Sequence, residues 1–493
     1  MKKIYISIFV LAAFTFTGCA DDYLDVKQTE TISTDDMELL NNDNGAKTFV
    51  TSIYSKFLDW DMSSFGWIGL ASITSDDADK GSTPSDTGTD KDVLDALTYN
   101  ASNPSAESTF NANYDGINRC NQALDILPKL DKADPALRER LMGEAKFLRA
   151  FMYFTLVKCY GGVPIVDHIA KIPLSTEDKA MQLTRKSTAE VYAFIEKDLA
   201  EAAAVLPNKS QYSSDEKARA SKGACYALLA KVSLYQKKWQ SVVDNCNLVT
   251  GYIISPDYAK MFRLEGENDG ESIFEINGNG AVPARGIQGY SNTQGVRDAW
   301  GWGFNQPSQS LVNAYEPGDV RKDATIIFRG TTLYDGRVIP QIYDKDGNVD
   351  NTLNPRYNFK AYSSAYTSAW ETDANIKYLR YAEVLLMKAE ALNELGQTSE
   401  AIPLLNIIRH RAGLGDTPAV SQDAVRTAIW KERRVELAFE FDRFFDLVRT
   451  GQAKDAFAVD GKVFTVGKNE LFPIPASFIL VAEGMSSQNP GYN

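Results

Sequence analysis

The strongest pattern in the chain is the stretch Trp430–Arg443, WKERRVELAFEFDR, which continues as FFDLVRTG over Phe444–Gly451. Its large apolar side chains recur at helical spacing, so the pattern predicts one amphipathic helix that ends at a Gly451 cap. Arg434 falls on the apolar face of this helix. Because a buried charge without a partner is very costly, we expect Arg434 to be buried against carboxylates and to tie the helix to the rest of a helical-repeat scaffold.

The amino-acid sequence of this stretch closely resembles that of the SusD/RagB family of outer-membrane glycan-binding lipoproteins. The resemblance includes Leu471–Pro475 (LFPIP) and the terminal Gln488–Tyr492 (QNPGY). It extends over four further segments, in the same order along the chain: Glu144–Ala150, Cys159–Pro164, Arg380–Gly396 and Ile407–Gly413. The resemblance implies a scaffold of helix hairpins, a function in glycan binding without catalysis, and a SusC-like TonB-dependent transporter as partner.

The N-terminal residues predict export and lipid attachment. Lys2-Lys3 precedes an apolar run that is too short to span a bilayer and that closes with Gly18-Cys19. We therefore expect a lipoprotein signal peptide over residues 1–18, an acylated Cys19, and a polar tether over residues 19–43. An ordinary secretory signal with a chance cysteine is the alternative. The resemblance to the family implies an outer-membrane location with exposure at the cell surface, and Ala20-Asp21-Asp22 after Cys19 resembles the acidic export signal of surface lipoproteins in the bacteria that carry this family.

Composition excludes several classes of function. The chain has 52 basic and 65 acidic residues, a net charge of −13, which disfavours nucleic acid because phosphates demand surplus Lys and Arg. The same charge disfavours a polyanionic glycan, unless a local basic pocket overrides the average. Only two histidines are present and no zinc, nucleotide or P-loop motif occurs, so we expect neither a metal nor a cofactor.

Four cysteines other than Cys19 lie inside helical patterns. The pattern favours buried thiols, and a disulfide stays possible in an exported protein. The acidic run Asp344–Asp350 fails the spacing of a calcium loop and predicts a hairpin turn. The four cysteines are Cys120, Cys159, Cys225 and Cys246.

Helical periodicity predicts a mainly α fold within residues 44–493. Two pairs of segments look like tetratricopeptide-type hairpins, which cannot bury their apolar faces without neighbours. These pairs are Lys217–Gln236 with Trp239–Thr250, and Ile376–Leu395 with Ser399–Ala412.

Residues 252–375 interrupt the helical pattern. This segment is rich in glycine and carries two Asp-Gly turn signals, Asp335-Gly336 and Asp346-Gly347, each beside short β-prone runs. It predicts a loop-rich insertion with short β-hairpins, mounted on the helical scaffold. Functional residues concentrate in such insertions.

One segment of the insertion has the residues that a glycan site needs. Aromatic rings stack on the apolar faces of sugars, and polar side chains bond the hydroxyls. Tyr290, Arg297, Trp300, Trp302 and Phe304 combine both kinds, and the last three would share one face if the segment were extended. The alternative is a strand that packs these rings into the core, although the intervening glycines disfavour it.

A second segment contains residues that could contact the same glycan. Trp67 precedes Asp76 and Asp77, and loops in this region contribute polar contacts to glycan in the proteins that the chain resembles. A solvated acidic loop, or helix caps, would explain the two aspartates equally well. Trp370 is a further candidate platform, although packing against the next helix favours a structural role.

The sequence shows no catalytic motif such as a GxSxG elbow. The prediction is therefore a non-enzymatic surface protein that binds oligosaccharide or polysaccharide and delivers it to a transporter. Two alternatives remain, an all-α surface glycoside hydrolase and a helical-repeat scaffold that binds only protein. A hydrolase needs only two placed carboxylates, which a sequence cannot exclude.

Overall fold

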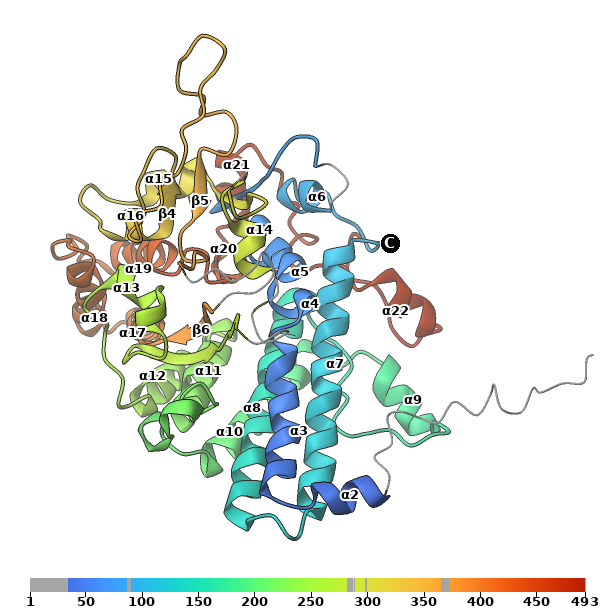
Figure 1. The fold of residues 1–493 in the computed structure, drawn as a ribbon. Coiled ribbons are helices and arrows are strands. Elements are labelled where there is room, and N and C mark those ends of the chain that lie inside the picture. The colour runs from blue at the N-terminus through green and yellow to red at the C-terminus, as the bar shows by residue number, and fades with distance from the viewer. Residues whose placement is uncertain are drawn as a thin grey trace, which may run out of the picture.

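A computed structural model describes residues 34–86, 90–281, 287, 289–297, 299–364 and 373–492 (Figure 1). The predicted signal peptide, Cys19, most of the predicted tether and Trp370 lie outside these residues. The described tether residues include helix α2, Thr34–Leu40. None of the helices that the structure describes is long and apolar enough to cross a membrane.

The first half of the chain is helical. Its longest helices begin with a capped turn: the Asn103 side chain accepts a bond from the Ala106 amide ahead of Pro104, and Asp134 does the same ahead of Pro135. The helices are α3 (Asp43–Lys56), α4 (Trp60–Ser63), α5 (Phe65–Ile68), η1 (Gly69–Ile73), α6 (Lys91–Asp95), α7 (Pro104–Ile126), η2 (Leu127–Lys129), α8 (Pro135–Tyr160), α9 (Thr176–Leu183), α10 (Thr188–Val205), η3 (Lys209–Gln211), η4 (Ser214–Glu216), α11 (Lys222–Tyr235) and α12 (Trp239–Leu248).

The middle of the chain contains short elements, and the last part is helical again. The middle elements are α13 (Tyr258–Met261), η5 (Leu264–Gly266), β2 (Ser272–Ile276), α14 (Tyr290–Gln294), β3 (Phe304–Pro307), α15 (Gln309–Ala314), α16 (Arg321–Thr325), β4 (Ile326–Phe328) and β5 (Arg356–Asn358). The last elements are β6 (Ile376–Arg380), α17 (Tyr381–Glu394), α18 (Thr398–Arg411), α19 (Gln422–Glu436), α20 (Arg443–Thr450), α21 (Ala453–Val459) and α22 (Ala476–Val481).

The helices form a continuous scaffold in which each hairpin packs on the next. The long helices α3, α7 and α8 lie side by side, and α10, α11, α12, α17, α18 and α19 continue the array (Figure 1). Small residues allow the close crossings: a Cβ on Gly116 of α7 would lie 2.4 Å from the Met152 side chain of α8. Because α12 packs directly against α17, the segment between them is looped out of the array. The predicted mainly helical fold is confirmed.

The looped-out segment lies over one end of the scaffold, and its beginning and end are joined by a pair of strands. There β2 pairs antiparallel with β6. The other two-stranded sheets are also antiparallel: β3 pairs with β1 (Ala78–Gly81), and β4 pairs with β5. Both Asp-Gly signals form the predicted hairpin turns, with bridges between Thr332 and Val338 and between Tyr343 and Val349.

Two predicted helices differ from the structure. The first five residues of Ile376–Leu395 form strand β6, because β2 provides a pairing edge for them. The stretch Trp430–Gly451 forms two helices instead of one. Helix α19 ends at Glu436 and α20 begins at Arg443, and Gly451 caps α20 in the left-handed conformation, as predicted.

The break between α19 and α20 sends neighbouring side chains to different places. Phe439 and Phe441 adopt positive φ angles of 64° and 71°, a conformation that bulky residues rarely adopt. Phe439 packs beside Ala78 and Leu311, whereas Phe441 packs 5.7 Å from the ring of Trp67. A continuous α-helix contains no left-handed residues, so these two phenylalanines mark the point where the helix is broken.

Buried charges surround this break, and we call them the charged core: Glu271, Lys360, Arg380, Arg411, Glu436 and Glu440. Arg380 donates to Glu440 at 2.6 and 2.8 Å and to Glu436 at 2.9 Å, while Lys360 donates to Glu440 at 2.7 Å. Burial alone would raise the pKa of Glu436, but Arg411, Arg380 and Arg321 outweigh it and hold that pKa well below its usual range. The charged core therefore joins α19, α18, β6 and the looped-out segment.

The four cysteines are buried thiols in α7, α8, α11 and α12, as the favoured interpretation predicted. In the Asp344–Asp350 hairpin, Asp344 accepts bonds from the amides of Asp346 and Asn348, each at 2.9 Å. That carboxylate serves the turn itself. The described residues contain no cluster of His, Cys, Asp or Glu that could hold a metal ion.

Candidate functional site

A group of half-buried rings lies where the first helices meet the looped-out segment. We call Trp60, Phe65 and Trp302 the aromatic platform. The ring centroid of Trp302 lies 5.8 Å from that of Trp60 and 6.2 Å from that of Phe65. Phe304, the first residue of β3, is buried behind them with its centroid 4.9 Å from Phe65. Half-buried tryptophans held by other rings present flat apolar surfaces at fixed angles.

Glycines allow the chain to place these rings. A Cβ on Gly289, which has a φ of 68°, would lie 2.1 Å from the Trp60 ring. A Cβ on Gly301 would lie 2.4 Å from the Gly295 Cα, because the two backbone segments cross there. The Trp302 amide donates to the Asn292 carbonyl at 2.8 Å, and the Gly303 amide donates to the Gly295 carbonyl at 2.9 Å. These close approaches explain the glycine spacing around Trp302.

Polar groups border the platform. Arg297 donates to Asp86 Oδ2 at 2.8 Å, to Ser82 Oγ at 2.7 Å and to the Trp302 carbonyl at 3.1 Å. The Ser82 hydroxyl, a Thr83 amide and Arg297 together lower the pKa of Asp86, so this carboxylate stays ionised. Lys91 places its ammonium 3.9 Å from the centre of the Phe65 ring. Sugar hydroxyls could bond to Arg297 and Asp86 at the edge of a stacked ring, whereas Lys91 is buried and donates to Asp90 and Ser105.

Trp300 lies apart from Trp302 and Phe304. Its ring packs 4.9 Å from Tyr362, and the Arg337 guanidinium lies 5.1 Å from its centre. The expectation that Trp300, Trp302 and Phe304 share one face is therefore wrong. The segment enters a strand only at Phe304, and the left-handed conformations of Gly303, with a φ of 76°, and Asn305, with a φ of 57°, interrupt an extended course.

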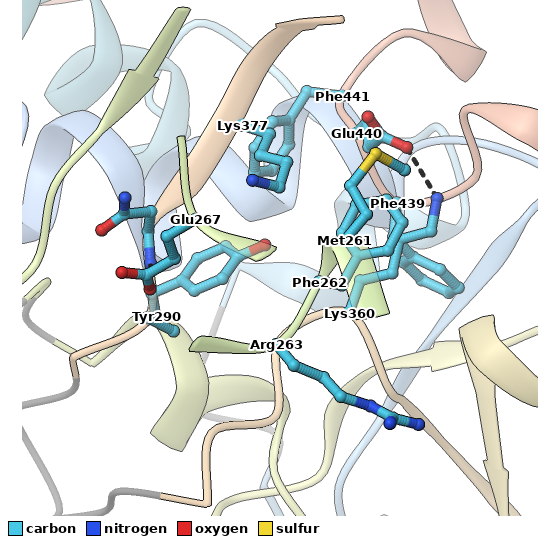
Figure 2. A pocket seen from close by; sticks show the side chains of 12 residues that line it. Met261, Phe262, Arg263, Glu267, Tyr290, Lys360, Lys377, Phe439, Glu440 and Phe441 are labelled. Carbon is cyan, nitrogen blue, oxygen red and sulfur yellow. Dashed lines mark hydrogen bonds and ion pairs between the residues drawn. The ribbon is translucent and has the colours of Figure 1, made fainter. Parts of the chain in front are cut away.

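Trp67 and Tyr290 lie in the interior. Trp67 is 5% exposed and stacks on Phe445 at 6.2 Å. Tyr290, also 5% exposed, extends from α14 into an internal cavity that it shares with Met261 and Lys377 (Figure 2). That cavity has a volume of only about 20 Å³, room for one water molecule. Neither ring can stack on a glycan in this conformation.

The same cavity holds two groups with shifted pKa values. Burial raises the pKa of Glu267 to about 7, with a further contribution from Glu275. Burial lowers the pKa of Lys360 to about 8, although Lys360 donates to Glu440 (Figure 2). A space for one water is too small for a sugar, so this cavity is an interior feature of the scaffold.

Asp76 and Asp77 are buried and bonded to arginines of the C-terminal stretch. Arg443 holds Asp76 through two bonds of 2.6 and 2.7 Å, and Arg434 donates to Asp77 at 2.7 Å. The pairing predicted for Arg434 is thus confirmed, with its side chain 15% exposed. These aspartates do not face solvent, and they position the segment before β1, the strand that pairs with β3 and so with Phe304 behind the platform.

Sequence reasoning missed Trp60 and Asp86. Trp60 precedes Trp67 by seven residues, and large apolar residues stand close to both, Phe57 and Leu58 before Trp60 and Phe65 and Ile68 around Trp67, so no local signal separates the surface ring from the core ring. Asp86 lies in a Ser- and Thr-rich loop. Only the long-range contacts with Trp302 and Arg297 identify either residue.

Family comparisons cover nearly the whole chain. A model described as "SusD family" matches residues 270–492, and one described as "Starch-binding associating with outer membrane" matches residues 22–234. The chain belongs to the SusD/RagB family. SusD-like proteins are non-catalytic glycan-binding proteins associated with the outer-membrane surface.

Relatives of this SusD/RagB chain match it over most of its length. SusD-like protein P2 of Formosa agariphila is 29% identical over 71% of this chain and 73% of its own. A solved SusD-like protein of Bacteroides fragilis superposes with a TM-score of 0.76 at 26% identity, covering 92% of this chain and 98% of the other. A laminarin binding SusD-like protein superposes with a TM-score of 0.75 at 29% identity, covering 92% and 100%.

Proposed function

We propose that the chain captures an oligosaccharide or polysaccharide at the cell surface, with Trp302 and Trp60 as the rings on which sugars stack. The observation that carries this proposal is the pair of half-buried tryptophans, fixed 5.8 Å apart by close glycine contacts. Arg297 and Asp86 supply hydrogen bonds to hydroxyls. The buried Phe304, Tyr290, Trp67, Asp76 and Asp77 hold the platform in place, and Trp300 with Arg337 offers a second ring for a longer chain.

Laminarin is the first ligand to test, because a relative of similar fold binds it. Stacking on one ring is worth on the order of 0.5–1.5 kcal/mol, so Trp302→Ala should weaken binding roughly two- to tenfold with an almost unchanged melting temperature. Trp67→Ala is the matched control, since it removes a buried ring and should cost about 3–5 kcal/mol of stability. Affinity gels and calorimetry measure the binding, and chemical denaturation measures the stability.

The outcome separates the alternatives. Unchanged glycan retention by Trp302→Ala would show that the platform is not the binding surface. Sugar products released during the incubation would favour a hydrolase, and absence of binding to any polysaccharide in the gels would favour a protein-binding scaffold.

We further propose lipid attachment at Cys19 and delivery of the glycan to a SusC-like TonB-dependent transporter. The Gly18-Cys19 sequence, the export signal before it and the family's association with the outer membrane support this. Cys19→Ala should move the protein from the membrane pellet to the soluble fraction, because stable anchoring needs acyl chains. Purification of the lipidated chain from detergent-solubilised membranes without such a transporter would refute the partnership.

A further inference from the structure

A polar cleft lies near the aromatic platform, between the β4–β5 sheet and the start of α15. Its volume is about 350 Å³, within the range of small-ligand sites. Figure 1 shows β4, β5 and α15 together at the outer end of the looped-out segment. The cleft is lined by Gln309, Phe328, Arg329, Asn351, Pro355 and Arg356.

The two arginines of the cleft bond only to neutral oxygens among the described residues. Arg356 donates to the Pro307 carbonyl at 2.9 Å and to Gln309 Oε1 at 2.6 Å. Arg329 donates to the carbonyls of Asn354 and Pro340, at 2.7 and 3.1 Å, and to the Tyr357 hydroxyl. A guanidinium has five N–H bonds, so about half of those on the two side chains have no partner within the described structure.

Neither guanidinium has a carboxylate within ion-pair distance in the described part of the chain. The arginines of the charged core differ, because Arg380 alone contacts Glu271, Glu436 and Glu440. Burial lowers the pKa of Arg356, and the more distant Asp79 only partly opposes this. On a chain with a net charge of −13, two neighbouring half-buried arginines without acidic partners form a local positive site.

The cleft and the platform are connected by one strand. Phe304, which supports the platform, begins β3, and Pro307, which accepts the bond from Arg356, ends it. Four residues of strand span roughly 10 Å at about 3.3 Å per residue. The strand thus separates the buried support of the platform from the cleft by a length comparable to a short oligosaccharide.

We propose that this cleft binds an anionic substituent of the glycan, either a uronate carboxylate or a sulfate ester. The proposal rests on glycan capture at the platform. Free N–H groups arranged in a planar fork match the paired oxygens of such groups, and charge-assisted bonds of this kind are about twice as strong as neutral ones. The site thus selects glycans with a negative charge a short distance from the stacked ring, despite the acidic surface of the whole chain.

Three matched probes test the proposal: laminarin, laminarin oxidised to the carboxylate at C6, and laminarin sulfated at C6. We expect wild type to bind at least one anionic form about tenfold more tightly than the neutral form, with a preference that shrinks as ionic strength rises. Arg356→Gln should abolish this preference and leave laminarin binding unchanged. Arg119→Gln is the matched control, because Arg119 is also half-buried and bonds only to the Ser52 carbonyl, far away on α7.

Each outcome has one meaning. Tight binding of the sulfated form alone assigns a sulfate ester, tight binding of the oxidised form alone assigns a uronate, and tight binding of both assigns a site that recognises charge. Equal affinity for all three probes, or a preference that survives in Arg356→Gln, overturns the anionic site and leaves glycan capture standing. Failure of wild type to bind any of the three overturns both proposals for this family of ligands.

Discussion

The charged core and the aromatic platform differ in how the chain builds them. The charged core joins Glu436 and Glu440 of the most recognisable stretch, Trp430–Arg443, to residues such as Arg380 of β6 and buries them: Glu436 is 0% exposed and Arg380 is 1% exposed. The platform gathers Trp60, Phe65 and Trp302 from segments with no recognisable motif and leaves them half-buried. The stretch that identifies the family therefore holds the scaffold together, whereas the residues proposed to contact glycan carry no family signature. Ligand preference can then change without disturbing the fold.

The largest expected effect concerns the charged core. Arg380→Ala leaves Glu271, Glu436 and Glu440 buried with fewer cations, which should cost about 3–5 kcal/mol of unfolding free energy. Arg426→Ala is the control, because Arg426 pairs with Glu394 on a partly exposed face and its removal should cost less than about 1 kcal/mol. Chemical denaturation compares the two, and similar losses would mean that the charged core is not the centre of stability.

An intermediate effect is expected at the contact between the two regions. Arg434→Ala removes the 2.7 Å bond to the buried Asp77, while Asp76 keeps Arg443, so the loss should be about 2–4 kcal/mol. Arg434→Lys should restore only part of it, because an ammonium lacks the planar fork. Laminarin affinity of the folded variant should change less than twofold. A large loss of affinity with little loss of stability would show that Asp77 faces the ligand, which would erase the distinction between the regions.

The smallest effect is a change in pH dependence at Glu267. Its pKa of about 7 in the folded protein lies above the ordinary value of 4.5, so its contribution to stability is full below about pH 4.5 and is lost as the pH rises through 7. Glu267→Gln cannot ionise. Relative to wild type, it should therefore gain roughly 1–2 kcal/mol between pH 5 and pH 8, a range that allows for partial solvent exposure.

Denaturation at both pH values measures the difference. Glu265→Gln, a change at an exposed neighbour, should follow wild type at both. If the unfolding free energies of Glu267→Gln and wild type changed equally with pH, Glu267 would be solvent-exposed. The cavity that it lines would then be accessible to ligands.

Local patterns predicted the scaffold and failed at contacts between distant segments. The hairpins around α11–α12 and α17–α18 were predictable because helical spacing and small crossing residues are local. The break at Leu437–Asp442 was not, because the spacing of apolar residues continues through it and no local signal marks the left-handed conformations of Phe439 and Phe441. Asp76 and Asp77 suit a sugar as well as an arginine, and the choice depends on Arg434 and Arg443, more than 350 residues later. Burial of Trp67 instead of Trp60 likewise depends on Phe441 and Phe445.

The C-terminal residues pack against the end of α8 and against Tyr99, in the first part of the chain. The Phe472 amide donates to the Cys159 carbonyl at 2.7 Å, Asn489 donates to the Tyr160 carbonyl at 3.0 Å, and Tyr492 stacks on Tyr99 at 6.0 Å. The end of α8 is therefore completed by residues that are synthesised more than 300 positions later. The N-terminal half cannot complete its folding during translation or export, because these long-range contacts form only after the C-terminal segment has emerged. Folding must end as one late step, and a product cut short before Phe472 would expose the end of α8 to proteases.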